Sequence, residues 1–178
     1  MLRQSIENLG NRTIQGVWRI GFATRFLLAV LLHSGTAFGR FGLTIREMYF
    51  TGVLSLIIIL VAGLFVGIVL GMQGYETLKR YGSESALGTL VALSLVRELG
   101  PVLAALLFAS RAGSAMTAEI GLMKATEQIS AMEMMAVNPI ARVVAPRFWA
   151  GVISMPILAA MFSAMGVFGG YMVGVVMI

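Results

Sequence analysis

The sequence contains no cysteine, no aspartate and only one histidine, His33. Without thiols it has no disulfide framework, no thiolate metal site and no cysteine nucleophile. A single histidine and the absence of aspartate also argue against a histidine metal site or a Ser-His-Asp triad. No G-x-x-x-x-G-K-[ST] motif occurs, so the chain does not hydrolyse a nucleotide through a P-loop of its own. We therefore expect a protein that is not an enzyme and holds no metal or cofactor itself.

Charge is also scarce. Only 12% of the 178 residues are charged and 58% are hydrophobic, with a mean hydropathy of +0.91. Soluble domains carry roughly a quarter charged residues, so this composition predicts an all-α integral membrane protein. The net charge of +5 does not indicate nucleic-acid binding, because six arginines fall within residues 1–46. That clustering fits an anionic membrane surface.

Three apolar runs, 52–72, 86–110 and 149–178, are long enough to cross a bilayer. The first has no charge in 21 residues, about 31 Å of helix, which matches the hydrocarbon thickness. The third is 30 residues long and reaches Ile178 without a polar flank. This ending predicts that the chain is a fragment.

Residues 1–47 have a different pattern. Phe26–Leu32 is apolar but lies between Arg25 and His33, and is too short to span. Upstream, apolar residues at helical intervals alternate with arginines and predict an amphipathic helix lying in the membrane plane. The alternative is a partly ordered basic tail. The apolar positions are Ile6, Leu9, Ile14, Val17 and Ile20, and the arginines are Arg3, Arg12 and Arg19.

The positive-inside rule gives an orientation. Residues 1–47 carry six basic and two acidic side chains, and residues 111–148 carry four and three. The loop 73–85 is neutral, with two of each sign. We expect the N-terminus and residues 111–148 to be cytoplasmic and the 73–85 loop to lie outside.

Arg97 and Glu98 interrupt the second apolar run, directly before Gly100-Pro101. An ionised side chain near the bilayer midplane costs at least about 2.5–3.5 kcal/mol and normally faces protein or a water-filled cavity. Proline also loosens the helical hydrogen-bond ladder. The pair is therefore either a polar working point that meets substrate or a structural ion-pairing site that braces the bundle. Because adjacent helical residues point about 100° apart, the two need not pair with each other.

Two spans carry glycines at intervals of four, the spacing that lets helix backbones approach closely. The spacing leaves open whether the partner helix belongs to the same chain or to a second copy. These glycines are Gly63, Gly67 and Gly71 in the first span and Gly166, Gly170 and Gly174 in the third.

The segment 117–138 is composed of good helix formers and ends at Asn138-Pro139. Ile129 and Met132 share a face of it, and further methionines lie beside them. Methionine-rich faces suit insertion into a groove on a partner. The alternative is that this face packs onto the protein's own spans.

A series of motifs along residues 48–178 resembles the MlaE/YrbE family. These motifs are Arg97-Glu-Leu-Gly-Pro101, Arg111-Ala-Gly-Ser-Ala115, Thr117-Ala-Glu-Ile-Gly121, Glu127-Gln-Ile-Ser-Ala-Met-Glu133, Asn138-Pro139 and Pro146-Arg147. Members are permease subunits of ABC transporters that move phospholipid across the Gram-negative envelope and maintain outer-membrane lipid asymmetry. The resemblance implies a multi-pass protein of the bacterial inner membrane, with residues 48–178 as the permease domain and 1–47 as an amphipathic segment. Because family members continue with further spans, it also implies an incomplete permease.

The resemblance further implies partners: a second permease copy, a cytoplasmic ABC ATPase that binds ATP and magnesium, a STAS-domain protein and a periplasmic hexamer of MCE-domain subunits. It identifies the segment between the second and third spans as the coupling helix on the ATPase. The residues we expect to take part in coupling are Glu119, Glu127, Ile129, Met132, Glu133 and Met135.

Lipid tails require an apolar wall, which we expect at the outer end of the first span. The candidates are Leu64, Ile68, Leu70, Leu78 and Tyr81. Two other functions stay open from the residues alone. One is a proton-coupled secondary transporter that uses Glu98 as its proton site, and the other is a membrane scaffold without transport activity.

Overall fold

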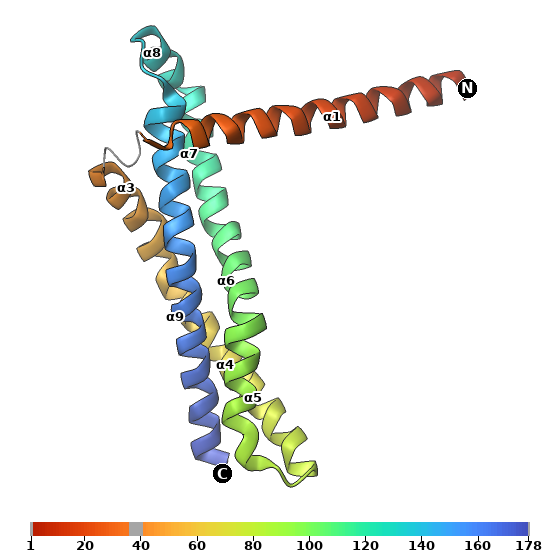
Figure 1. Ribbon diagram of the computed structural model, residues 1–178, viewed down its shortest axis with the longest axis vertical. Coiled ribbons are helices and arrows are strands. Elements are labelled where there is room, and N and C mark those ends of the chain that lie inside the picture. Colours follow the sequence, from red (N-terminus) through yellow and green to blue (C-terminus); the bar gives the residue numbers. More distant parts are fainter. Residues whose placement is uncertain (1, 36–40, 178) are drawn as a thin grey trace.

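The computed structural model describes residues 2–35 and 41–177, and within these ranges the chain is helical with no strand (Figure 1). Runs of Leu, Ile, Val, Ala and Met explain this, since only helices satisfy every backbone hydrogen bond within a lone apolar segment. The predicted all-α membrane class is confirmed.

Three long helices lie side by side and form a bundle (Figure 1). The first consists of α3 (Phe41–Met48), the π-helical turn η1 (Tyr49–Val53) and α4 (Leu54–Arg80). The second consists of η2 (Glu84–Ala86), α5 (Leu87–Leu93), η3 (Ser94–Leu99), α6 (Gly100–Phe108), η4 (Ala109–Gly113) and α7 (Ser114–Ala125). The third consists of η5 (Ile140–Val144) and α9 (Ala145–Met177), and the short α8 (Gln128–Met134) precedes it.

The stretches Gly42–Arg80, Glu84–Ala125 and Ile140–Val176 are each long and apolar enough to cross a membrane. They have 39, 42 and 37 residues, about 55–63 Å of helix, so each extends beyond a hydrocarbon core of about 30 Å. The runs predicted from sequence lie inside these helices, and Ile178 of the third run lies outside the described residues. Residues 41–47, which the sequence places in the N-terminal segment, form the start of the first long helix.

A fourth helix, α1 (Leu2–Leu32), projects sideways from the bundle (Figure 1). Its stretch Gly10–Leu32 has 23 residues and is also long and apolar enough to cross a membrane. Only 6% of the most apolar part of this stretch is buried against the rest of the protein. The sequence argument counted Phe26–Leu32 alone because Arg25 interrupts the run. The helix continues through Arg25, however, and adds Val17, Trp18 and Phe22 to the apolar length.

The glycines of the first and third spans pack against each other within the chain. A methyl group on Gly63 would lie 2.7 Å from the carbonyl oxygen of Phe162, and one on Gly67 would overlap the carbonyl of Gly166. α4 and α9 are therefore in backbone contact, which is possible only where side chains are absent.

The second long helix completes the core. Leu95 and Phe162 have no exposed surface, and Ile59 is 1% exposed. Leu87, Val91, Ala104 and Leu158 complete this cluster. Because each of the three long helices contributes to it, the middle of the bundle is filled with side chains.

Candidate functional site

Arg97 and Glu98 lie on the π-helical turn η3 and are exposed on the outside of the bundle. Among the described residues, neither side chain has an ion-pair or hydrogen-bond partner. The opposite side of the same turn is packed, because Leu95 is fully buried and a methyl group on Gly100 would clash with Ser163. The turn thus directs both charged residues away from the core.

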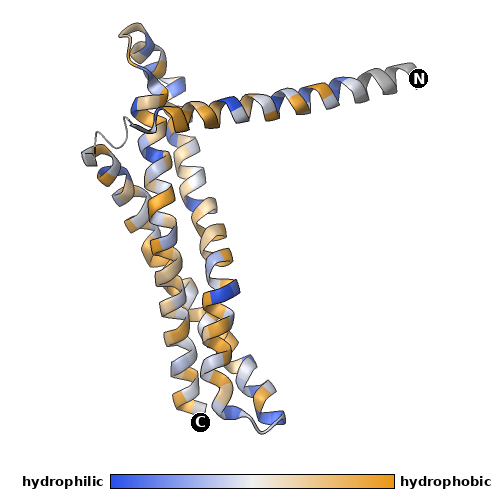
Figure 2. Ribbon diagram, in the orientation of Figure 1, coloured by the Kyte–Doolittle hydropathy of each residue, from blue (hydrophilic) through white to orange (hydrophobic). Residues whose placement is uncertain are grey.

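The surface around this turn is apolar. Leu93, Val96, Val102 and Leu106 are all exposed beside it. Figure 2 shows a strongly hydrophilic patch partway along the otherwise apolar second helix. π-helical turns are often found at functional sites, and two opposite charges within an apolar band need a cover other than lipid tails.

The residues expected to form a lipid wall are dispersed. Leu64, Ile68, Leu70 and Leu78 are half-buried, and Leu70 and Leu78 pack against the core cluster. Tyr81, beyond the end of α4, is 79% exposed. None of the five lines the two grooves described next, which lie between described helices of the bundle.

Those cavities lie nearer the ends of the bundle. One, of about 300 Å³, is an apolar groove between the α3–α4 helix and α9. Its lining includes Met48, Gly52, Leu56, Ser154 and Met161. The other, of about 370 Å³, lies at the opposite end, between α5 and the last turns of α9. The sequence analysis identified neither, because each groove is formed by residues far apart in the chain.

The expected coupling segment 117–138 forms a helical hairpin of α7 and α8, which extends past the bundle at the end where α1 joins it (Figure 1). The turn is made at Glu127, whose φ of 58° is left-handed. Asn138 ends the hairpin, and its Oδ1 accepts a hydrogen bond from the amide of Ile140 at 3.0 Å. Asparagine favours such caps because its side chain replaces a missing helical partner.

The hairpin presents methionine to its surroundings. Met134 is 86% and Met135 67% exposed, whereas Ile129 and Met132 are half-buried. Glu127 and Glu133 are exposed beside them. Neither α7 nor α8 contains a buried residue, so the methionine surface is available to a partner.

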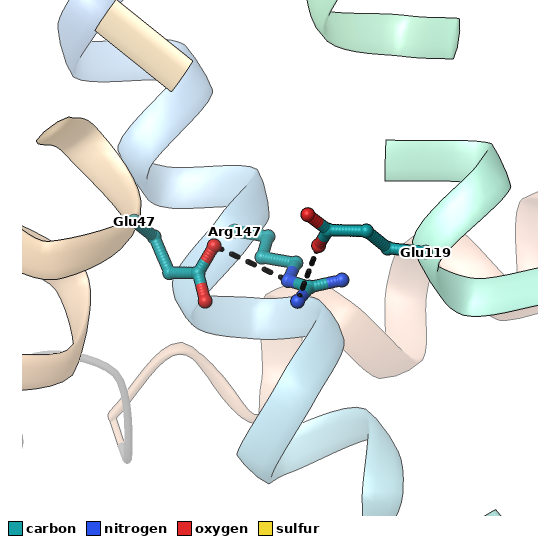
Figure 3. Close-up of polar contacts among 3 residues, drawn as sticks. All are labelled: Glu47, Glu119 and Arg147. Atoms are coloured by element: carbon teal, nitrogen blue, oxygen red, sulfur yellow. Dashed lines mark ion pairs between the residues drawn. The ribbon is translucent and has the colours of Figure 1, made fainter. Parts of the chain in front are cut away.

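Glu119 has a partner within the chain. Arg147, near the start of α9, contacts two carboxylates from two other helices (Figure 3). Its Nη2 lies 2.7 Å from Glu119 Oε2 on α7, and its Nε lies 3.3 Å from Glu47 Oε2 on α3. The Arg147 side chain is only 14% exposed. We define these residues as the Arg147 triad, which joins all three long helices at the hairpin end.

This triad is not predicted by the sequence, in which Glu119 is expected at the ATPase-coupling surface and Arg147 stands only in the motif Pro146-Arg147. The available signal was an arginine, directly after Pro146, at the start of a long uncharged run. The two glutamates are 28 and 100 residues from Arg147, so no spacing rule brings them together.

Three further contacts stabilise the same end of the bundle. Arg111 Nη1 donates a hydrogen bond of 2.6 Å to the Oγ of Ser55, which is itself buried. Val30 of α1 is 2% exposed and packs against Ala145. Asn138 Nδ2 lies 3.2 Å from His33 Nε2, so the end of α1 contacts the base of the hairpin.

The chain is similar in sequence to known permease proteins. The family model for Permease MlaE matches residues 44–178. The chain is 55% identical to the intermembrane phospholipid transport system permease protein MlaE of Haemophilus influenzae, over 98% of this chain and 67% of that protein. It is 39% identical to a probable ABC transporter permease protein of Rickettsia bellii, over 98% of this chain and 68% of that protein. A probable ABC transporter permease protein of Synechocystis is 35% identical over 94% of this chain and 65% of its own length.

Proposed function

The chain belongs to the MlaE permease family, and from this premise we propose that it is the membrane subunit of an ABC transporter that moves phospholipid between the inner and outer membranes. The observation that carries this proposal is the 55% identity, over 98% of the chain, to a permease named for intermembrane phospholipid transport. Maintenance of outer-membrane lipid asymmetry is the physiological role that follows from such transport.

In this proposal the permease performs no bond chemistry. A separate cytoplasmic ATPase binds ATP and magnesium, and the α7–α8 hairpin inserts its exposed methionines into a groove on that ATPase. Methionine is flexible and polarizable, so it fits a groove that changes shape during hydrolysis. The protein then lies in the inner membrane. Its N-terminus and the hairpin are on the cytoplasmic side, as the distribution of basic residues favours.

The remaining partners are a second permease copy, a STAS-domain protein and a periplasmic hexamer of MCE-domain subunits. The exposed turn at Arg97 and Glu98 favours the presence of a second permease copy, because the turn places two charges on an outer apolar face of the bundle. A polar cavity between two bundles would cover that turn and give a lipid headgroup a place to pass.

α1 lies in the membrane plane in this proposal. Arg12 and Arg19 share one side of the helix, Ile14 and Val17 lie on the opposite side, and Ile20 lies between the two sides. All three apolar side chains are exposed. Such a helix buries its apolar side at the headgroup boundary and holds its arginines near lipid phosphates.

The hairpin surface gives a direct test. We compare the wild-type transporter with Met134→Asp/Met135→Asp, purifying each from the native membrane in mild detergent and identifying co-purified proteins and lipids by mass spectrometry. We expect the double variant to lose the ATPase while the protein stays folded, because two charges enter an apolar contact. The matched control, Gln73→Asp/Thr77→Asp, adds the same charges to exposed positions at the opposite end of α4 and should retain the ATPase.

A wild-type chain that purifies without an ATPase and without phospholipid would contradict the proposal. Movement of solute driven by a proton gradient, and lost in Glu98→Gln, would favour the secondary transporter instead.

A further inference from the structure

The hairpin packs weakly against the rest of the protein. α7 and α8 contain no buried residue. Within residues 41–177 of the structure, the ion pair that joins the hairpin to another helix is Glu119 with Arg147. A displacement of the hairpin reaches α9 along the covalent chain through Asn138, through the second long helix, of which α7 is the end, and directly across this ion pair.

Arg147 is suited to pass such a displacement on. A guanidinium is a planar fork with several donors, so it can hold two carboxylates in fixed directions at once. Here one edge meets Glu119 on α7 and the other lies near Glu47 on α3. Arg147 itself lies near the start of α9, which is continuous for 33 residues. A movement of α7 is thus transmitted to both other long helices.

The environment strengthens the contact. The Arg147 side chain is 14% exposed, against 26% for Glu47 and 57% for Glu119. Charges removed from water interact more strongly than exposed ones, so burial strengthens the contact on the side of Arg147 and Glu47, while solvent screens Glu119. Its Nε and Nη1 atoms are also buried without a hydrogen-bond partner among the described residues, so the 3.3 Å contact with Glu47 is an ion pair without a hydrogen bond. A buried donor left unsatisfied costs about 1–3 kcal/mol, so the triad is not arranged for greatest stability alone.

Glu119 lies close to the turn of the hairpin. α7 continues from Glu119 to Ala125, six residues further on, which is about 9 Å of helix at 1.5 Å per residue. The turn at Thr126 and Glu127 then joins α7 to α8. A push at the methionine surface of α8 therefore reaches Glu119 through this turn and a short length of rigid helix.

We infer that Arg147 is a positioning residue for coupling: it carries motion of the α7–α8 hairpin to α3 and α9 through Glu119 and Glu47. This inference rests on the proposed function, in which an ATPase moves the hairpin. Loss of the triad should then separate ATP hydrolysis from phospholipid movement. A purely structural role would lower both activities together.

The test uses the complete transporter, purified with its ATPase and reconstituted in vesicles of phosphatidylethanolamine and phosphatidylglycerol. ATP hydrolysis is measured beside ATP-dependent movement of an NBD-labelled phosphatidylethanolamine, read from its accessibility to dithionite. For Arg147→Met, which keeps an apolar stem of similar length, we expect hydrolysis within about twofold of wild type and the lipid moved per ATP about tenfold lower. Arg147→Lys keeps the charge but holds a single partner and should be intermediate.

Two further variants sharpen the assignment. Glu119→Gln should lower the lipid moved per ATP, and combining it with Arg147→Met should lower that ratio no further, since both changes break one contact. Glu76→Gln makes the same chemical change at an exposed position at the far end of α4 and should behave as wild type. An unchanged ratio in Arg147→Met, or a parallel fall of both activities, would overturn the inference.

A second measurement needs no substrate. The chain has no native cysteine, so spin labels can be placed at Ser130→Cys on α8 and Gly42→Cys on α3, both exposed. We expect a narrow distance distribution in the wild-type background and a broader one with Arg147→Met. Equal distance distributions in the wild type and in Arg147→Met would contradict the role of the triad in holding the hairpin. Should the wild type hydrolyse ATP without moving lipid, the proposed function fails, and these distances still decide whether Arg147 holds the hairpin.

Discussion

Replacing Gly67 by alanine tests whether backbone contact between α4 and α9 holds the bundle together. The added methyl group would overlap the carbonyl oxygen of Gly166, which belongs to the main chain and has no rotamer to change. The helices must therefore separate. Overpacking of this kind costs about 1–3 kcal/mol, while the gain in helix propensity from glycine to alanine returns about 1 kcal/mol. Since the obstacle is backbone, we take the upper figure and expect a net loss of about 2 kcal/mol.

Neighbouring glycines supply a graded series. A methyl group on Gly63 would lie 2.7 Å from a backbone oxygen, and one on Gly71 would lie 3.1 Å from the Cβ of Val173. Gly121 has nothing within 4 Å of the added position. We therefore expect the loss of stability to decrease from Gly67→Ala through Gly63→Ala to Gly71→Ala, and Gly121→Ala to be neutral or stabilising.

The assay is unfolding by SDS in mixed micelles, followed by the fluorescence of Trp149 in a Trp18→Phe background. Trp149 packs in the cluster formed around Val30 and Ala145 at the start of α9, so its emission reports on that packing. Equal stability of Gly67→Ala and wild type would refute the argument. So would a loss in Gly121→Ala as large as that in Gly67→Ala, since the effect would then not depend on the contact.

Three other changes have defined outcomes. Phe162→Ala empties a fully buried site and should cost about 3 kcal/mol or more in the same SDS titration, unless α9 collapses onto the space. Ser55→Ala removes the acceptor of the hydrogen bond from Arg111 and should cost about 1–3 kcal/mol, with Thr77→Ala, an exposed hydroxyl, as the unaffected control. Arg97→Leu/Glu98→Leu should stop ATP-dependent phospholipid movement in vesicles without lowering stability, because both side chains point out of the bundle. A destabilised variant that still transports would assign them a bracing role.

The sequence allowed the long helices, the helical character of segment 117–138 and its stop at Asn138 to be predicted, because each depends on local composition. The turn at Glu127, which divides that segment into α7 and α8, was not predicted. Apolar length predicts spans, and asparagine before proline predicts a helix boundary wherever it occurs. The glycine spacing predicted close helix packing but left the partner open. The structure places that partner in the same chain, since Gly67 meets Gly166.

The polar contacts could not be predicted in the same way. Glu119 has the same local context whether it faces an ATPase or Arg147, and only the position of α9 distinguishes the two. The π-helical turn η3 could not be predicted from the sequence either. The sequence did contain one signal, because Pro101 leaves the carbonyl of Arg97 without its usual helical hydrogen-bond donor. For α1, a rule that stopped the apolar run at Arg25 underestimated a helix that continues through that residue.

The way the three helices are held limits how the protein moves. Along the apolar length, Ile59, Leu95 and Phe162 fill the centre, and the glycines bring α4 and α9 into backbone contact. Close-packed interiors deform little, so this part should move as a rigid body. The charged turn at Arg97 and Glu98 lies on its outer surface. In the proposed transport cycle, lipid therefore passes beside this bundle, against a second bundle or further spans, and the Arg147 triad sets the tilt of the whole body.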